Sequence, residues 1–179
     1  MAANTDKEGY SNFDKNGCSC NYREDKFSVI TSANIVNLEY FEEIGRFNDK
    51  LFIDMVDYDY CLRINIKKFK ILYFPDVFVE HKLGEVHLRT NIFTRKKKYK
   101  TEHNAQRAYY IARNYLYVAR NYGKYFPNDV GMLHILNIVF IHDVTKILIY
   151  EIDKWNKLKA KFIGLYHFLI NRYGKYNLK

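Results

Sequence analysis

The sequence predicts an α/β first half followed by a helical and basic second half. Two runs rich in β-branched and aromatic residues, Phe27–Val36 and Phe69–Phe74, are typical of strands, and Pro75 is expected to end the second. The stretch Glu102–Tyr122 has the apolar spacing of a long helix instead. The 179 residues are enough for one domain with a core, so we expect an α/β domain that continues into a helical region.

Further helices and strands are expected between and after these runs. Asn37 has the side chain of a helix N-cap, and Gly45 is a residue that ends helices. The expected elements are, in order, a helix Leu38–Ile44, a helix Asp57–Lys67, a strand Val77–Glu80, an irregular basic stretch Val86–Lys100, and helices Val130–Lys159 and Phe162–Arg172. The chain therefore divides into a polar, partly disordered segment 1–26, an α/β region 27–100 and a helical region 101–179.

Composition indicates a folded chain with an anionic partner. Apolar residues make up 48% of the chain and aromatic residues 17%, which excludes an intrinsically disordered protein. The net charge of +9 points to nucleotide phosphate, lipid head groups or nucleic acid. Cys18, Cys20 and Cys61 form neither a disulfide framework nor a zinc pattern, and the polar N-terminus has no signal peptide, so we expect a reduced, cytosolic protein.

Three carboxylates, Asp54, Asp57 and Asp59, fall within six positions of this basic chain. Asp54 precedes a helix that is expected to begin near Asp57, where the helix dipole favours an anion. A carboxylate at such a loop-to-helix junction is suited to act as a general base or a metal ligand. Taken alone, the spacing favours plain capping charges; the order of the surrounding motifs favours the functional interpretation.

One face of the expected helix Glu102–Tyr122 carries Arg, Asn, His and Tyr side chains. They suit phosphate and sugar hydroxyls, because Arg offers a donor fork and Tyr offers a ring with a hydroxyl. A solvated face is the commoner explanation for mixed polar residues, but such faces usually carry Lys and Glu, so we expect a binding face. Its members are His103, Gln106, Arg107, Tyr110, Arg113, Asn114, Tyr117 and Asn121.

The stretch Met132–Tyr150 is rich in Ile, Leu and Val but is interrupted by polar residues. No uninterrupted run approaches the ~20 apolar residues that a membrane span needs. We expect either a helix packed on the domain or an interfacial helix on a bilayer surface. Basic residues after it would suit anionic lipid. These are Lys154, Lys157, Lys159, Lys161, Arg172 and Lys175.

Six short motifs follow one another in a specific order. They are the turn Thr31-Ser32-Ala33-Asn34, the loop Gly45–Asn48, the acidic segment Phe52–Arg63, the strand-Pro segment Ile71–Pro75, the His-x-x-Gly of His81–Gly84, and the Arg-x-Tyr-Tyr-x-x-Arg-Asn of Arg107–Asn114. From about Ile30 to Tyr122, this order resembles the C-terminal half of inverting family 2 glycosyltransferases with the GT-A fold, particularly rhamnosyltransferase-like enzymes. The stretch Gly164–Gly174 is also similar to the tail of these enzymes.

The resemblance implies part of a GT-A, Rossmann-like catalytic domain in residues 27–100, followed by a helical extension. The implied reaction transfers a sugar such as rhamnose from a nucleotide-diphosphate sugar to a lipid-linked or polysaccharide acceptor, in bacterial cell-wall or capsule synthesis. Asp57 matches the catalytic base that deprotonates the acceptor hydroxyl, and His81 matches a position that reaches the metal or the donor diphosphate. Further residues implied in acceptor or donor binding are Ser32, Asp54, Asp59, Arg107, Tyr110, Arg113 and Asn114.

The chain departs from the family pattern in several places. Ala33 and Arg46 replace glycines, and Lys68 stands where a helix-ending glycine is typical, at a cost of roughly 1 kcal/mol if its backbone is left-handed. The family's N-terminal half, whose Asp-x-Asp binds metal and nucleotide, is not matched. We therefore expect Mg²⁺ or Mn²⁺ in the complete enzyme and weak or no metal binding by this chain alone, with a partner chain supplying the donor half.

Two functions remain open from the sequence. One is the acceptor half of a glycosyltransferase. The other is a truncated, non-catalytic accessory protein that docks on an anionic membrane surface or on a partner transferase. Both place the chain in the cytoplasm, at the inner face of the cell membrane. A nucleic-acid partner is not expected, because the basic run Arg95–Lys100 lacks any recognised binding signature.

Overall fold

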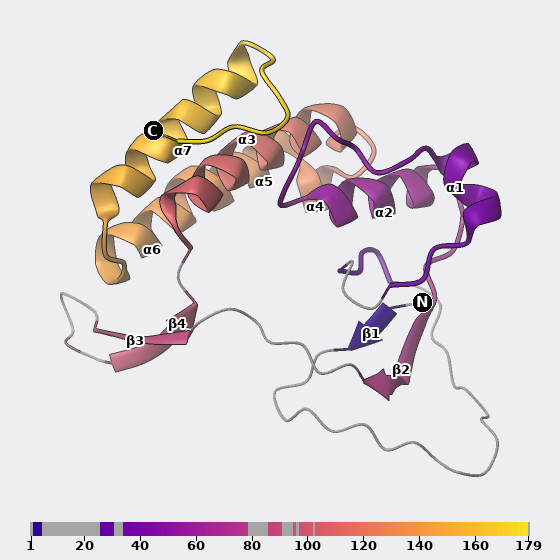
Figure 1. Ribbon diagram of the computed structural model, residues 1–179, viewed down its shortest axis with the longest axis horizontal. Helices are drawn as coiled ribbons and strands as arrows, with labels where there is room; N and C mark the ends of the chain where they lie inside the picture. The colour runs from indigo at the N-terminus through magenta and orange to yellow at the C-terminus, as the bar shows by residue number, and fades with distance from the viewer. Residues whose placement is uncertain are drawn as a thin grey trace. The chain divides into compact units, whose positions relative to one another are not determined.

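The computed structural model describes residues 2–4, 26–30, 34–78, 86–90, 95, 97–101 and 103–178. The chain forms two compact units. Unit 1 consists of Met1–Asn48 and Val56–Leu83, and unit 2 consists of Asp49–Met55 and Gly84–Lys179. Figure 1 shows the elements of both units, coloured from indigo to yellow along the chain.

Unit 1 contains the helices α1 (Leu38–Ile44) and α2 (Val56–Ile66). The Asn37 side chain caps α1 by accepting a hydrogen bond from the Glu39 amide at 2.9 Å. Gly45, with φ of 91°, ends the helix. The predicted bounds and both predicted caps of α1 are confirmed, and α2 lies within one residue of its predicted bounds.

The end of α2 is a Schellman motif centred on Lys68. Lys68 has φ of 60°. Its amide donates to the Asn65 carbonyl at 3.0 Å, and the Phe69 amide donates to the Ile64 carbonyl at 3.1 Å. We predicted that Lys68 occupies a position where a helix-ending glycine is typical, and its left-handed backbone confirms this.

The strands of unit 1 differ from the prediction. Strand β2 (Tyr73–Phe78) pairs in parallel with β1 (Ala2–Asn4) and continues through Pro75. Proline lacks an N–H group but is tolerated in edge strands, and both strands of a two-stranded sheet are edges. The predicted strands Phe69–Phe74 and Val77–Glu80 are therefore wrong in their bounds. The predicted strand Phe27–Val36 is also wrong, since its described residues, 27–30 and 34–36, are not in a strand.

Unit 2 begins with a β-hairpin followed by a central helix. Strands β3 (Val86–Thr90) and β4 (Lys97–Thr101) pair antiparallel, with Val86 opposite Thr101. The irregular stretch expected here is wrong, because apolar and polar residues alternate in β3 with the period of a strand. The helix α3 (Ala105–Tyr122) confirms the long helix predicted, starting three residues later, after the N-cap Asn104.

The helix α3 is buried on almost every side. Helix α7 (Lys154–Leu169) packs along it, as Figure 1 shows. Their closest approach is at Gly164, where a Cβ atom would lie 2.5 Å from the Tyr109 carbonyl oxygen. A second group of helices completes this core. The residues buried together are Ala112, Leu116, Ala119, Ile135, Val139 and Phe168.

That second group is a helical run of 24 residues, Pro127–Tyr150. Its parts are α4 (Pro127–Val130), α5 (Met132–Leu136), the π-helical η1 (Asn137–His142) and α6 (Asp143–Tyr150). By length and composition the run could cross a membrane, a test that core helices of soluble proteins also pass. Polar residues interrupt the apolar sequence of this run without ending the helix, and the two expected positions, packed on the domain or lying on a bilayer surface, stay predictions.

The predicted boundary between the helices Val130–Lys159 and Phe162–Arg172 is wrong, because the break lies between Tyr150 and Lys154. The chain leaves the helix after Tyr150 and enters α7 through Asp153, which has φ of 56°. Aspartate tolerates this left-handed conformation better than most residues. Its carboxylate also accepts a hydrogen bond from the Asn156 side chain at 2.6 Å.

Candidate functional site

Asp57 lies in the first turn of α2, where the sequence placed it. Its side chain is half-buried, and Oδ1 accepts a hydrogen bond from the Tyr58 amide at 2.9 Å. The positive end of the helix dipole stabilises an ionised carboxylate at this position. The geometry therefore suits a carboxylate that takes a proton from a hydroxyl group.

Asp59, two residues later, is fully buried and makes structural contacts. Its Oδ2 lies 2.9 Å from Nη2 of Arg63, and its Oδ1 accepts a hydrogen bond from the side-chain amide of Asn48 at 3.2 Å. Arg63 in turn donates to the carbonyl oxygens of Ile44, Gly45 and Arg46, at the end of α1. Asp59 therefore helps to join α1 to α2, and the ligand contact that the resemblance implied for it stays a prediction.

In unit 2, the loop Asp49–Met55 is held by two buried side chains of α3. The Asn114 amide donates to the carbonyl oxygens of Leu51, Ile53 and Asp54, at 2.8, 2.6 and 3.1 Å. Arg113 donates to the carbonyls of Lys50 and Leu51, both at 3.1 Å. Both side chains are fully buried. The loop is thus fixed by hydrogen bonds to its main chain, which do not depend on its side chains.

Three residues of this loop have left-handed backbones. Phe52, Asp54 and Met55 have φ of 64°, 60° and 65°. Such angles are unfavourable for residues other than glycine and persist where the surroundings impose them. The donors from α3 supply that constraint. The segment that leads into the Asp57 helix is therefore held in one conformation.

Asp54 and Arg107 form the most accessible charged pair of the loop. The Arg107 guanidinium lies 2.9 Å from the Asp54 carboxylate, with 48% of the Arg107 side chain exposed and 12% of that of Asp54. A partly exposed arginine of this kind keeps donors for an anionic ligand.

Three further predicted members of the α3 face, Tyr110, Arg113 and Asn114, are buried in the protein. The Tyr110 hydroxyl donates to the Tyr176 carbonyl at 3.0 Å and accepts from the Tyr176 amide at 2.7 Å. Arg113 also donates to the Gly174 carbonyl at 2.8 Å. Neither a solvated face nor an open binding face describes these side chains, because the loop and the C-terminal tail cover them. Direct substrate contacts for Tyr110, Arg113 and Asn114 stay predictions.

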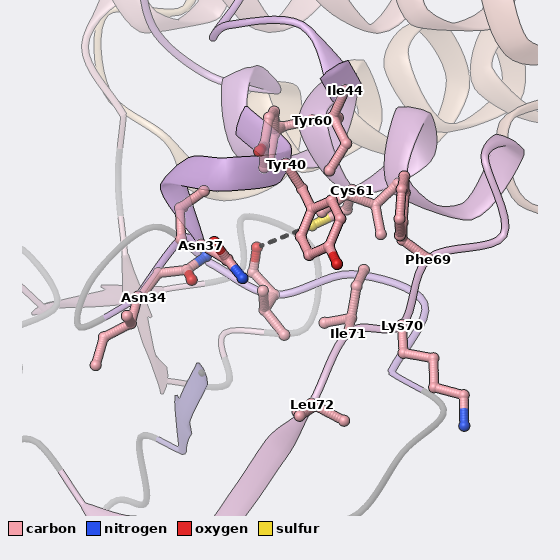
Figure 2. Close-up of a pocket in the computed structure, with 14 residues that line it drawn as sticks. Asn34, Asn37, Tyr40, Ile44, Tyr60, Cys61, Phe69, Lys70, Ile71 and Leu72 are labelled. Atoms are coloured by element: carbon pink, nitrogen blue, oxygen red, sulfur yellow. Dashed lines mark hydrogen bonds between the residues drawn. The ribbon is translucent and has the colours of Figure 1, made fainter. Parts of the chain in front are cut away.

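Unit 1 has a cavity of about 420 Å³ along one face of α2. Asp57, Tyr60, Cys61 and Ile64 share that face at helical spacing, and the last three line the cavity. Figure 2 shows the Cys61 thiol within hydrogen-bonding distance of the Val29 carbonyl. Burial raises the pKa of this thiol, and the negative charge of Asp57 adds to the effect. The Tyr60 hydroxyl is buried, without a hydrogen-bond partner among the described residues.

Two predicted site residues, Ser32 and His81, lie outside the described residues. Among the residues that the structure does describe, no three His, Cys, Asp or Glu side chains gather as metal ligands. The binding of Mg²⁺ or Mn²⁺ by the complete enzyme stays a prediction.

Two buried polar groups of unit 2 escaped the sequence analysis. The Tyr109 hydroxyl lies 2.9 Å from Nδ1 of His167, in contact with Arg113. Lys157 and Lys161, predicted to face lipid, are instead 3% and 1% exposed. The acidic residues Asp143 and Glu151, which precede these lysines in the sequence, were the available signal for buried ion pairs.

Comparison with known proteins gives one partial similarity. A segment of 57 residues is 35% identical to the dTDP-rhamnosyl transferase RfbF of Shigella flexneri. It covers 32% of this chain and 19% of that protein, so the similarity extends over about a fifth of the relative's length. No family model matches the chain. No solved structure matches it either.

Proposed function

We propose that this chain carries the acceptor side of a nucleotide-sugar-dependent glycosyltransferase, with Asp57 as its base. The partial similarity to a dTDP-rhamnosyl transferase supports a glycosyltransferase-like activity. The observation that carries the residue assignment is the position of Asp57, half-buried in the first turn of α2. A GT-A fold for residues 27–100 is part of this proposal.

In the proposed reaction, the Asp57 carboxylate accepts the proton of an acceptor hydroxyl as that oxygen attacks the anomeric carbon of the sugar. The bond from the sugar to the nucleoside diphosphate breaks on the opposite face, so the configuration inverts. A carboxylate in the first turn of a helix lies at the positive end of the helix dipole, a position suited to a general base. The donor would be a dTDP-linked sugar such as dTDP-rhamnose, and the acceptor a lipid-linked or polysaccharide glycan.

The loop Asp49–Met55 would contribute by positioning. Its conformation is set by Arg113 and Asn114, and it leads directly into α2. Arg107, with its exposed donors, is the described α3 residue best suited to contact a phosphate or a sugar hydroxyl.

Complementation in the native cells tests the base. Cells that lack this chain are expected to lose a surface glycan, and the wild-type chain is expected to restore it. Asp57→Asn should restore none, because the amide cannot take the proton. Asp129→Asn, which alters an exposed carboxylate in α4, is the matched control and should restore the glycan fully. The readout is the glycan profile on a gel, with chain abundance measured by immunoblot.

Restoration by Asp57→Asn would contradict the catalytic assignment. It would favour an accessory protein that assists a partner transferase, since such a role requires the fold without the base. An unchanged glycan in cells lacking the chain would contradict both functions.

A further inference from the structure

The helical run Pro127–Tyr150 has an outer face of unusual composition. Its large apolar side chains are exposed, with Leu133 at 84% and Ile141 at 64%, and in the most apolar stretch of the run only 17% of the residues are buried. The structure describes every residue from Gly131 to Tyr150. The acidic and basic residues of this stretch are Asp143 and Lys146, and neither side chain is exposed. A helix that formed the core of a soluble unit would show the opposite pattern.

The charged groups associated with this run are turned inward instead. Lys161 of α7 lies 2.6 Å from the Asp143 carboxylate and donates to the Val139 carbonyl at 3.1 Å. Glu151 lies 3.0 Å from Lys157 and 3.3 Å from Lys146. Charges paired inside a helical bundle, beneath an apolar exterior, are characteristic of proteins whose outer surface meets lipid.

The polar groups left on the outer face are compatible with this environment. Between Gly131 and Tyr150 they are His134, Asn137, His142 and Thr145, none of them a permanent charge, while the exposed Asp129 lies in α4, at the start of the run. The Thr145 hydroxyl donates to the Ile141 carbonyl at 2.6 Å, so its donor is satisfied within the helix. Hydroxyls that bond back to the preceding turn are common in helices that contact lipid.

Helix α7, which packs on α6 and follows it after a short connection, also has an apolar outer stripe. Trp155, Phe162, Tyr166 and Leu169 lie on one side at helical spacing, 83%, 66%, 59% and 63% exposed. The opposite side of α7 is buried against α3 and α6. Lys159 lies among these rings, and Trp and Tyr are the residues that proteins place at the boundary between head groups and hydrocarbon.

We propose that the outer faces of the run Pro127–Tyr150 and of α7 are immersed in the head-group boundary of an anionic bilayer, with both helices parallel to its surface. The exposed basic residues Lys159, Arg172 and Lys175 complement anionic head groups. A second copy of the chain is a poorer occupant, because the basic residues Lys159, Arg172 and Lys175 would meet like charges across a two-fold contact. The inference does not depend on the transferase activity.

The packing of α3 argues for helices in the plane of the membrane. The helix α3 covers the inner side of α5 and η1, and it carries Arg113 and the exposed Arg120. A run that crossed the bilayer would carry the exposed Arg120 towards hydrocarbon, at a high cost, whereas Arg113 is buried and hydrogen-bonded. An interfacial position exposes one side of the bundle to lipid and leaves α3 on the aqueous side.

Trp155 is the single tryptophan of the chain, so it reports on membrane contact directly. With vesicles of phosphatidylglycerol and phosphatidylcholine, the full chain should float, and Trp155 emission should shift to shorter wavelength. Brominated lipids should quench it most strongly when the bromines lie near the head groups. Leu133→Glu should lower the partition coefficient about tenfold or more, since a leucine that the bilayer would cover is replaced by a charge.

Leu38→Glu is the matched control. Leu38 is 78% exposed at the start of α1 in unit 1, so its replacement should leave vesicle binding unchanged. Circular dichroism would confirm that both variants fold. Failure of the wild-type chain to float, equal binding by the two variants, or complete release by high salt would overturn the proposal. Dimers that require Leu133 would overturn it in favour of a second copy, and a chain that resists alkaline extraction would overturn it in favour of a spanning helix.

Discussion

Lys68 has a backbone conformation that normally belongs to glycine. Its amide and that of Phe69 close the end of α2 by donating to Asn65 and Ile64. A residue with a Cβ atom loses stability in this conformation, whereas glycine adopts it freely. The position therefore stores strain that a substitution can remove.

Lys68→Gly should stabilise the protein by about 1 kcal/mol, because the left-handed backbone then carries no Cβ penalty. Urea unfolding followed by circular dichroism would measure the change. Lys67→Gly is the control, since Lys67 lies in the same turn without a positive φ. A gain from Lys67→Gly, or none from Lys68→Gly, would contradict the explanation.

At the scale of elements, α3 organises unit 2 by binding main-chain oxygens. Asn114 alone donates to three carbonyls of the loop Asp49–Met55. Buried carbonyls that lose their donors retain the full cost of desolvation. The Asn114 side chain therefore stabilises the loop by supplying donors to its buried carbonyl groups.

Asn114→Leu should destabilise the protein by about 3 kcal/mol, because it keeps the volume and removes the donors. Asn121→Leu, at an exposed position in the last turn of the same helix, should change stability by less than about 0.5 kcal/mol. Chemical unfolding of both variants would test this. Equal effects would mean that the amide bonds contribute little.

Local signals predicted the helices well and the strands poorly. The N-cap Asn37, the stop at Gly45 and the start of α2 depend on a few neighbouring residues, and each was predicted correctly. The pairing of β1 with β2 joins segments some seventy residues apart, which no local pattern contains. The break at Asp153 was missed because the apolar spacing continues across it.

The candidate site shows the same division between local and distant contacts. The position of Asp57 at a helix start followed from the sequence. The burial of Arg113 and Asn114 did not, because their partners are carbonyls about sixty residues earlier, and any residue type supplies a carbonyl. The sequence identified Arg113 and Asn114 as side chains with several hydrogen-bond donors, but it did not show which acceptors they contact.

At the scale of the whole molecule, the buried imidazole of His167 and the half-buried imidazole of His103 link stability to pH. Burial lowers the pKa of His167, and the charges of Arg172 and Arg113 lower it further. Burial lowers the pKa of His103 as well, with Arg107 and Lys146 contributing. The unfolded chain therefore takes up these protons at a higher pH than the folded protein does.

Stability should be complete above the unfolded histidine pKa of about 6.5 and should fall as the pH drops below it, because protons then favour the unfolded state. Urea unfolding from pH 8 to pH 5 would measure the slope. His167→Gln should reduce the slope, while His134→Gln, at an exposed position, should leave it as in the wild type. Stability that rose on acidification would contradict the assignment.

The π-helical turn η1 has a consequence for how relatives of this chain should be aligned. At 3.6 residues per turn, Ile147 would lie about a third of a turn away from Ile135, yet both are buried. The wider turn, in which the Asp143 amide reaches the Ile138 carbonyl, absorbs this difference. It acts as a one-residue insertion, so a relative with a regular helix here should align only with a one-residue gap between Asn137 and His142. An ungapped alignment would match its buried positions to exposed ones.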